Sequence, residues 1–163
     1  NHLCLGSRFH GKAKNMPLVF KAAGKYLDVV SVNYYNAWTP DQNLMNMWVK
    51  ESGKPFIITE WYAKGVDSGL PNVTGAGWLV KTQQDRAKFY HNFAIGLMQN
   101  KDCVGWHWFK FLDNNPEDIN AESSNKDSNK GVINWQYKPY AGLLEEMKRL
   151  NDNVYQLIDY FDR

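Results

Sequence analysis

The amino-acid sequence predicts an α/β fold, built from four strand–helix units of the kind that form half of a (β/α)8 barrel. Short runs of β-branched and aromatic residues alternate with segments that carry apolar residues at helical spacing. The predicted strands are almost continuously apolar, which is typical of parallel strands buried on both faces. A complete barrel usually needs about 250 residues, so the 163 residues here fit roughly half of one. A small doubly wound sheet is the alternative, although no Gly-rich phosphate loop follows any predicted strand.

The predicted elements follow one another in regular order. Strands are expected at 2–9, 28–35, 55–61 and 103–109, and helices at 17–27, 41–52, 82–100, 139–149 and 154–161. Pro17 suits a first helical turn, Gly53 suits a helix end, and Thr82 with Asp85 forms a variant of the capping box. We therefore expect residues 1–163 to form a single partial (β/α)8 domain. Within it, the Asn-, Ser- and Asp-rich segment 113–130 is expected to be a long solvated loop.

Composition excludes several classes of protein. With 44% hydrophobic and 22% charged residues, the chain has the balance of a globular domain rather than a disordered one. The net charge of +2 gives no reason to expect a nucleic-acid partner, and no apolar run is long enough for a membrane span. The two cysteines, Cys4 and Cys103, lie in apolar segments and are expected to be buried thiols. They have no metal-type spacing, so they predict no metal site.

Polar side chains stand at the ends of all four predicted strands. In a (β/α)8 barrel the catalytic groups lie at the carboxyl ends of the strands. The candidates for substrate binding at this edge are Arg8, Asn33, Tyr35, Trp61, Trp108, Lys110 and Asn114. They would line one mouth, and by strand parity Asn33 and Tyr35 face the same way.

Glu60 is the candidate catalytic residue. It follows the apolar run Phe-Ile-Ile-Thr directly, and a carboxylate there is costly to bury without partners. In retaining glycosidases one carboxylate attacks the anomeric carbon while a second carboxyl protonates the leaving oxygen. The attacking carboxylate must stay ionised, so it needs donors or cations nearby. A structural ion pair with Arg8 or Lys110 is the alternative interpretation.

Aromatic residues make up 15% of the chain, with seven Trp and nine Tyr. A surplus of this size indicates either a dense core or a sugar-binding cleft, where flat rings stack on pyranoses. Trp61 and Trp108 are placed at strand ends where such a platform would lie, whereas Trp106 is expected in the core.

The sequence resembles a known family at this point. The segment 54–61, preceded by 31–35 and Trp38, is similar to strands six and seven of clan A glycosidases. The segments 5–9, 75–83 and 104–110 are similar to β-agarases of glycoside hydrolase family 50, and the resemblance runs from residue 1 to about residue 140. It implies the C-terminal half of a (β/α)8 barrel, strands five to eight, and retaining hydrolysis of a β-linked galactan such as agarose. It also implies that Glu60 is the nucleophile and that no cofactor takes part.

The resemblance also carries a departure from the family. Its acid/base Glu ends strand four, usually after an Asn, and no second strand-end Glu occurs here. Glu51, Glu117, Glu122, Glu145 and Glu146 all lie elsewhere. We therefore expect the acid/base outside this chain and an inactive isolated fragment. If the parent protein degrades polysaccharide, we expect it to be secreted or periplasmic. Open half-barrel edges predict either a homodimer or a marginally stable fold. The alternatives are a non-catalytic carbohydrate-binding module and a self-associating half-barrel.

Overall fold

The computed structural model describes residues 2–163, and its centre is a four-stranded sheet. The strands are β1 (Arg8–Phe9), β2 (Val30–Asn33), β3 (Phe56–Glu60) and β6 (Cys103–Trp106). Their order in the sheet is β1-β2-β3-β6, and each neighbouring pair is parallel. Parallel strands that follow chain order, joined through helices, confirm the predicted α/β class.

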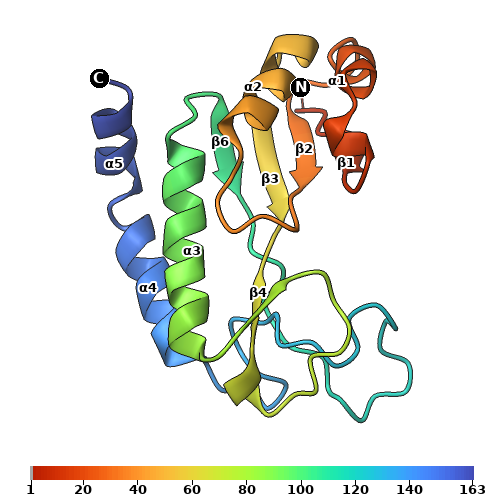
Figure 1. Ribbon diagram of the computed structural model, residues 1–163, viewed down its shortest axis with the longest axis vertical. Helices are drawn as coiled ribbons and strands as arrows, with labels where there is room; N and C mark the ends of the chain where they lie inside the picture. Colours follow the sequence, from red (N-terminus) through yellow and green to blue (C-terminus); the bar gives the residue numbers. More distant parts are fainter. Residues whose placement is uncertain (1) are drawn as a thin grey trace.

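Helices pack against this sheet. They are α1 (Pro17–Ala23), α2 (Gln42–Ser52), α3 (Gln83–Met98), α4 (Ala141–Asn151) and α5 (Val154–Phe161). Figure 1 shows α3, α4 and α5 together on one flank and α1 and α2 together near the top of the view. The two groups are in contact, because the Gln42 side chain of α2 donates to the Gly96 carbonyl oxygen of α3. None of the helices in residues 2–163 is long and apolar enough to cross a membrane.

Capping residues stabilise the ends of α2 and α3. The Asp41 carboxylate accepts hydrogen bonds from the backbone N–H groups of Asn43 and Leu44 at the start of α2. Gly53 ends the same helix in the left-handed conformation, which a residue without Cβ adopts at little cost. Thr82 caps α3 by accepting from the backbone N–H of Asp85.

Two predicted elements differ from the structure. The first strand was expected over 2–9, but only Arg8 and Phe9 pair with β2. No strand or helix is predicted in the segment 63–80, which contains the short strands β4 (Ala63–Gly65) and β5 (Trp78–Val80), which pair in parallel, and the 3-10 helix η2 (Val66–Ser68). A second 3-10 helix, η1 (Ala13–Asn15), precedes α1. Pairing partners decide both differences, and local sequence does not specify them.

The hydrophobic core lies between the sheet and the helices. Its largest members include Trp48 on α2, Trp61 after β3 and Phe93 on α3, each with 0% exposure. Trp61 stacks on Phe93 and Tyr90, with ring centroids 4.4 and 5.3 Å away. This aromatic stack fixes α3 against the end of β3.

A register irregularity lies where β2 and β3 end. Val32 pairs with Ile58, but the next residue, Asn33, pairs with Glu60, so β3 carries one extra residue. By simple alternation Glu60 would point to the same face as Phe56 and Ile58, which are buried in the core. A β-bulge re-aims the side chains that follow it. Glu60 consequently lines a cavity, and Trp61 takes the place in the core.

The polar segment 113–130 is only partly the solvated loop that its composition predicts. It contains no helix or strand, but Asp113, Ser128, Asn129 and Lys130 are each at most 1% exposed. The Asp113 carboxylate accepts hydrogen bonds from the backbone N–H groups of Lys130 and Gly131 and from the side chains of Asn129 and Tyr140. The middle of the segment is exposed, and its two ends are anchored in the domain.

Arg86 explains why this anchor lies inside the domain. Its guanidinium is fully buried on α3 and donates to the carbonyl oxygens of Ala63 and Gly131 and to the Gln83 side chain. Burial lowers the pKa of Arg86 to about 10, while the charge of Asp113 opposes that shift. A buried cation needs a nearby anion, and Asp113 supplies it.

The two cysteines do not both follow the expectation of buried thiols. Cys4 is exposed because the segment before β1 lies outside the sheet. Cys103 is partly buried on β6, and burial raises the pKa of its thiol to about 12.

Candidate active site

Glu60 lies at the carboxyl end of β3, and two side chains from neighbouring strands reach it. The Arg8 guanidinium forms an ion pair with Glu60 Oε1 at 2.5 Å, and the Tyr35 hydroxyl donates to Glu60 Oε2 at 2.8 Å. The Glu60 side chain is 13% exposed, whereas that of Arg8 is 57% exposed. Both carboxylate oxygens of Glu60 therefore have a hydrogen-bond donor.

Tyr35 is placed to remain a hydrogen-bond donor. Burial, followed by the nearby charge of Glu60, raises the pKa of Tyr35 well above its usual value. Its ring meets the ring of Tyr62 edge-on at 5.5 Å. Burial also raises the pKa of Tyr62, whose hydroxyl donates to Asn125 Oδ1 at 3.3 Å. Both phenols stay protonated at neutral pH.

A cavity of about 270 Å³ surrounds the Glu60 carboxylate. Side chains from β2, β3 and the long loop 107–139 line it together. The lining residues are His10, Asn33, Tyr35, Glu60, Tyr62, Ala76, Phe109, Glu122, Ser124 and Asn125. In Figure 1, β2 and β3 end toward the part of the molecule that holds β4 and the long loops. A second cavity, of about 640 Å³, shares His10, Asn33, Tyr35 and Ala76 with the first.

The structure brings four predicted site residues together. Arg8 and Tyr35 bind Glu60 directly. Asn33 lines the cavity, and its Oδ1 accepts a hydrogen bond from Thr59 Oγ1 at 2.7 Å. These residues come from the adjacent strands β1, β2 and β3, whose carboxyl ends meet at the same edge of the sheet.

Trp61 does not lie where the sequence placed it. Its ring is fully buried among Tyr90, Phe93 and Trp108, so no sugar can stack on it. The β-bulge before Glu60 is the physical reason, because it directs Trp61 toward the helices. Its indole Nε1 is buried without a hydrogen-bond partner. Trp61 is a core residue.

Trp108, Lys110 and Asn114 stand behind the cavity and do not line it. Trp108 is partly buried, and its Nε1 donates to the Lys130 carbonyl oxygen at 2.7 Å. Lys110 Nζ donates to Asn114 Oδ1 at 2.6 Å, and Asn114 Nδ2 donates to the carbonyl oxygen of Asn125. Their contacts support Asn125, which does line the cavity.

Several lining residues escaped the sequence prediction. Tyr62, Phe109 and Asn125 carry no motif, because they reach the cavity only through the bulge and the course of the long loop. Lys130 Nζ donates to the Asn125 carbonyl oxygen at 2.9 Å, and burial and the charge of Lys110 lower the pKa of Lys130 to about 8.

Glu122 is a second carboxylate on the same cavity. Hydrogen bonds from Ser124 and Asn125 hold its pKa below the usual value. A group that protonates a leaving oxygen at neutral pH needs a raised pKa instead. Glu122 is therefore poorly suited to be a general acid.

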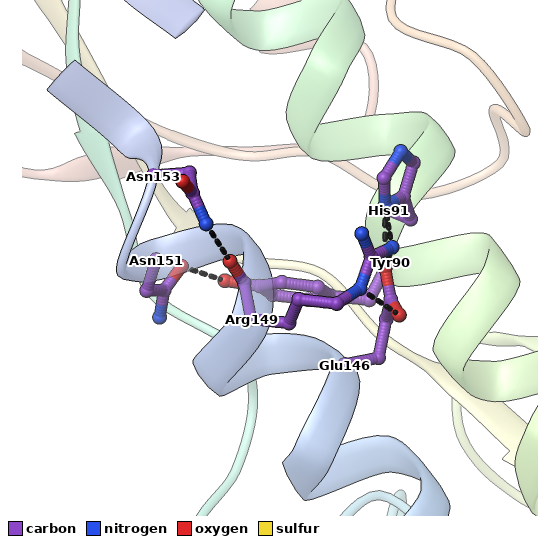
Figure 2. Close-up of polar contacts among 6 residues, drawn as sticks. All are labelled: Tyr90, His91, Glu146, Arg149, Asn151 and Asn153. Carbon is purple, nitrogen blue, oxygen red and sulfur yellow. Dashed lines mark hydrogen bonds and ion pairs between the residues drawn. The ribbon is translucent and has the colours of Figure 1, made fainter. Parts of the chain in front are cut away.

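A third cavity, of about 380 Å³, lies between α3 and α4. Figure 2 shows Glu146 and Arg149 of α4 reaching His91 of α3, while Tyr90 bonds Asn151 beside them. Burial alone would raise the pKa of Glu146, but hydrogen bonds from Arg149 and His91 more than offset it and lower that pKa. Because His91 of α3 and Arg149 of α4 both bind the Glu146 carboxylate, this cluster joins α3 to α4.

No cluster of three or more metal-ligating side chains occurs within residues 2–163. The donors around Glu60 are a guanidinium, a phenol and amides, which suit a carboxylate and a sugar.

The chain is similar to known agarases over almost all of its length. It is 36% identical over 159 residues to β-agarase B of Vibrio sp. (strain JT0107), an alignment covering 96% of this chain and 16% of that protein. The crystal structure of BpGH50 superposes with a TM-score of 0.90 at 46% identity, covering 99% of this chain and 33% of the other. An exo-β-agarase structure gives 0.81 at 29% identity, covering 97% and 20%. No family model matches the chain.

Both curated relatives are β-agarases, and the chain is similar to them over almost all of its own length. More narrowly, the chain is homologous to the family 50 agarases, with an α/β fold that matches their structures. It spans about a sixth of the length of the curated relatives it matches.

Proposed function

We propose that the protein containing this chain is a retaining β-agarase-like glycosidase, and that Glu60 is its nucleophile. The observation that carries the proposal is the position of the Glu60 carboxylate, which faces a cavity while Arg8 and Tyr35 each bind one of its oxygens. The substrate class is a β-linked galactan such as agarose. Homology to β-agarases supports that class.

Each neighbour has a distinct part in the proposed reaction. The Arg8 guanidinium binds Glu60 Oε1 and holds the carboxylate for attack on the anomeric carbon. The Tyr35 hydroxyl orients the carboxylate through its hydrogen bond to Oε2, which holds the attacking oxygen in position. Asn33, which lines the cavity beside them, is placed to bind a sugar hydroxyl. Neither step needs a metal or an organic cofactor.

The second carboxyl of a retaining pair would lie about 5–5.5 Å from Glu60. Glu122 lines the cavity, but its pKa is lowered, so it fits the acid role poorly. We therefore infer that the acid/base carboxyl belongs to a part of the protein outside these residues. The isolated chain would then bind sugar without hydrolysing it.

We also infer that the sheet is half of a (β/α)8 barrel in clan A, its strands being five to eight. The sequential parallel order β1-β2-β3-β6 supports this assignment, since consecutive barrel strands are neighbours. The edge strands β1 and β6 leave unpaired backbone groups, which favour association. Two isolated chains are therefore expected to pair as a homodimer, which sedimentation of the purified chain would test.

Substitution of Glu60 tests the nucleophile in the full-length protein. Glu60→Gln keeps the shape of the side chain and removes the charge, so agarose turnover should fall by several orders of magnitude while oligosaccharide affinity changes little. Glu51→Gln is the matched control, because Glu51 lies on α2 away from the cavity. Reducing-sugar release at the unsubstituted rate by Glu60→Gln would remove Glu60 from the role.

Proton NMR of the first product tests the mechanism separately. A covalent intermediate gives a product with retained anomeric configuration, whereas direct attack by water inverts it. An inverted first product would refute the retaining mechanism even if Glu60 proved essential.

A further inference from the structure

Basic residues alternate along the segment that leads from β1 into η1. They are Arg8, His10, Lys12 and Lys14, with Phe9, Gly11 and Ala13 between them. Arg8 is taken up by its ion pair with Glu60. Lys14 donates to the Tyr35 carbonyl oxygen at 2.9 Å and lies 4.4 Å from the centre of the Tyr34 ring. The other two basic side chains have different surroundings.

His10 and Lys12 are exposed, and neither side chain makes a hydrogen bond or ion pair within residues 2–163. The backbone that carries them is nevertheless ordered by hydrogen bonds. Ala13 N–H donates to the His10 carbonyl oxygen at 3.1 Å, and Asn15 N–H donates to that of Lys12 at 3.0 Å. The turn therefore holds the backbone of both basic residues in place beside the cavity.

Both groups line the cavity of about 640 Å³ that joins the Glu60 cavity. The remaining polar lining includes the side chains of Asn15 and Asn36, which are neutral. Asp41 is the one carboxylate among the lining residues, and its Oδ1 already accepts two backbone N–H groups at 2.9 and 3.2 Å. The Asp41 charge remains, but Lys12 and Lys14 together outweigh it, so the net formal charge of the lining side chains is positive.

We propose that this second cavity is a subsite for an anionic sugar unit, one that bears a sulfate ester or a carboxylate, next to the unit attacked by Glu60. The proposal rests on the proposed function. It adds that the substrate is a charged galactan, with Lys12 as the main contact to the anionic group and His10 beside it. The two cavities share four lining residues, so the subsite adjoins the reaction centre. The shared residues are His10, Asn33, Tyr35 and Ala76.

Binding to the full-length protein carrying Glu60→Gln tests this subsite without turnover. Calorimetry would compare three agaro-oligosaccharides of equal length: a neutral one, one with a single sulfate ester and one with a single carboxylate. We expect at least one charged ligand to bind roughly three- to tenfold more tightly than the neutral one at low ionic strength. The difference should shrink as salt is added.

Substitution then separates the charge of Lys12 from its bulk. Lys12→Met should remove the preference for the charged ligand and leave neutral binding unchanged, and Lys12→Arg should retain the preference. Lys25→Met is the matched control, because Lys25 is exposed away from both cavities. Lys14 is left unaltered since it holds Tyr35.

The outcomes distinguish this proposal from the one on which it rests. Equal affinity for neutral and charged ligands, or a preference that survives Lys12→Met, overturns the anionic subsite and leaves the glycosidase proposal standing. A failure to bind any of the three ligands overturns both. Preference for the sulfated ligand alone, or for the carboxylated one alone, supports the subsite and identifies its anion.

Discussion

Replacing Asp113 by Asn should destabilise the chain strongly, although the two side chains have nearly the same shape. The Asp113 carboxylate receives four hydrogen bonds, two at each oxygen, at 2.6 to 2.9 Å. In Asp113→Asn, the amide nitrogen would replace Oδ2 and meet the Asn129 amide and the Tyr140 hydroxyl, both of which now donate. Tyr140 can rotate its hydroxyl to accept. Asn129 cannot reverse, because its Oδ1 already accepts from Gly65 and Gln83.

The magnitude follows from the groups left without partners. One buried donor without an acceptor costs about 1–3 kcal/mol. Loss of the Asp113 charge also removes a favourable charge interaction with the buried Arg86. Taking the about 1–3 kcal/mol of the unpaired donor as the minimum effect, the melting temperature should fall by roughly 2–12 °C for a domain of this size.

Thermal and urea unfolding followed by circular dichroism measure this difference directly on the purified chain. Glu117→Gln is the control, because it removes one charge from the same segment and its side chain makes no hydrogen bond within residues 2–163. A decrease below about 1 kcal/mol for Asp113→Asn, comparable with the control, would refute the idea that buried loop ends anchor the domain.

Three further substitutions test other contacts. Tyr35→Phe removes the hydroxyl that donates to Glu60. Loss of a hydrogen bond to a charged group costs about 1.5–3 kcal/mol, so kcat of the full-length enzyme should fall roughly 10- to 100-fold. An unchanged kcat would contradict the proposed role of Tyr35. Gly24→Ala places a Cβ 2.0 Å from the Ser52 carbonyl oxygen and should cost about 1–3 kcal/mol of unfolding free energy, measured in urea. The pKa of Glu146 is lowered in the folded chain, so its contribution is present at neutral pH and disappears as pH falls below about 4.5. Glu146→Gln should therefore reduce stability at pH 7 and have little effect near pH 3, as measured by urea unfolding across pH.

Controls exist within the chain for two of these variants. Gly142→Ala is the comparison for Gly24→Ala, because a Cβ at Gly142 meets only the flexible end of Gln84, whereas at Gly24 it meets backbone. Equal effects of the two would contradict the close approach of α1 and α2. Glu145→Gln is the comparison for Glu146→Gln, since Glu145 is exposed on the same helix.

Local sequence patterns predicted the parts of the fold that local interactions determine. The capping residue Thr82 and the helix end at Gly53 both stand where the sequence placed them, whereas Asp41, predicted as the first residue of a helix, is its cap. The apolar runs of β2 and β3 likewise became buried parallel strands. Position at strand ends was enough to bring Arg8 and Tyr35 to Glu60, because carboxyl ends of parallel strands share an edge.

Tertiary pairing decided what the sequence could not predict. Residues 2–7 have a strand-like composition, but only the last residues of the predicted strand find a partner in β2. Glu60 faces the cavity and Trp61 faces the core because of a β-bulge, and a bulge depends on the pairing of two strands rather than on one local sequence. The exposed tryptophans in the described chain are instead Trp38 and Trp78, at 44% and 45% exposure, and they lie outside the predicted strands.

Because of the bulge in β3, two consecutive residues have different roles: one lines the cavity and the next packs in the core. Glu60 faces the cavity, and the next residue, Trp61, is held by the rings of Tyr90 and Phe93 on α3. A single peptide unit therefore transmits any shift of that helix to the carboxylate. In a random-mutagenesis screen, substitutions on the inner face of α3 should appear among variants with altered activity while retaining a folded protein. Engineering of the enzyme would have to treat this helix as part of the reaction centre, although no atom of it lines the cavity around Glu60.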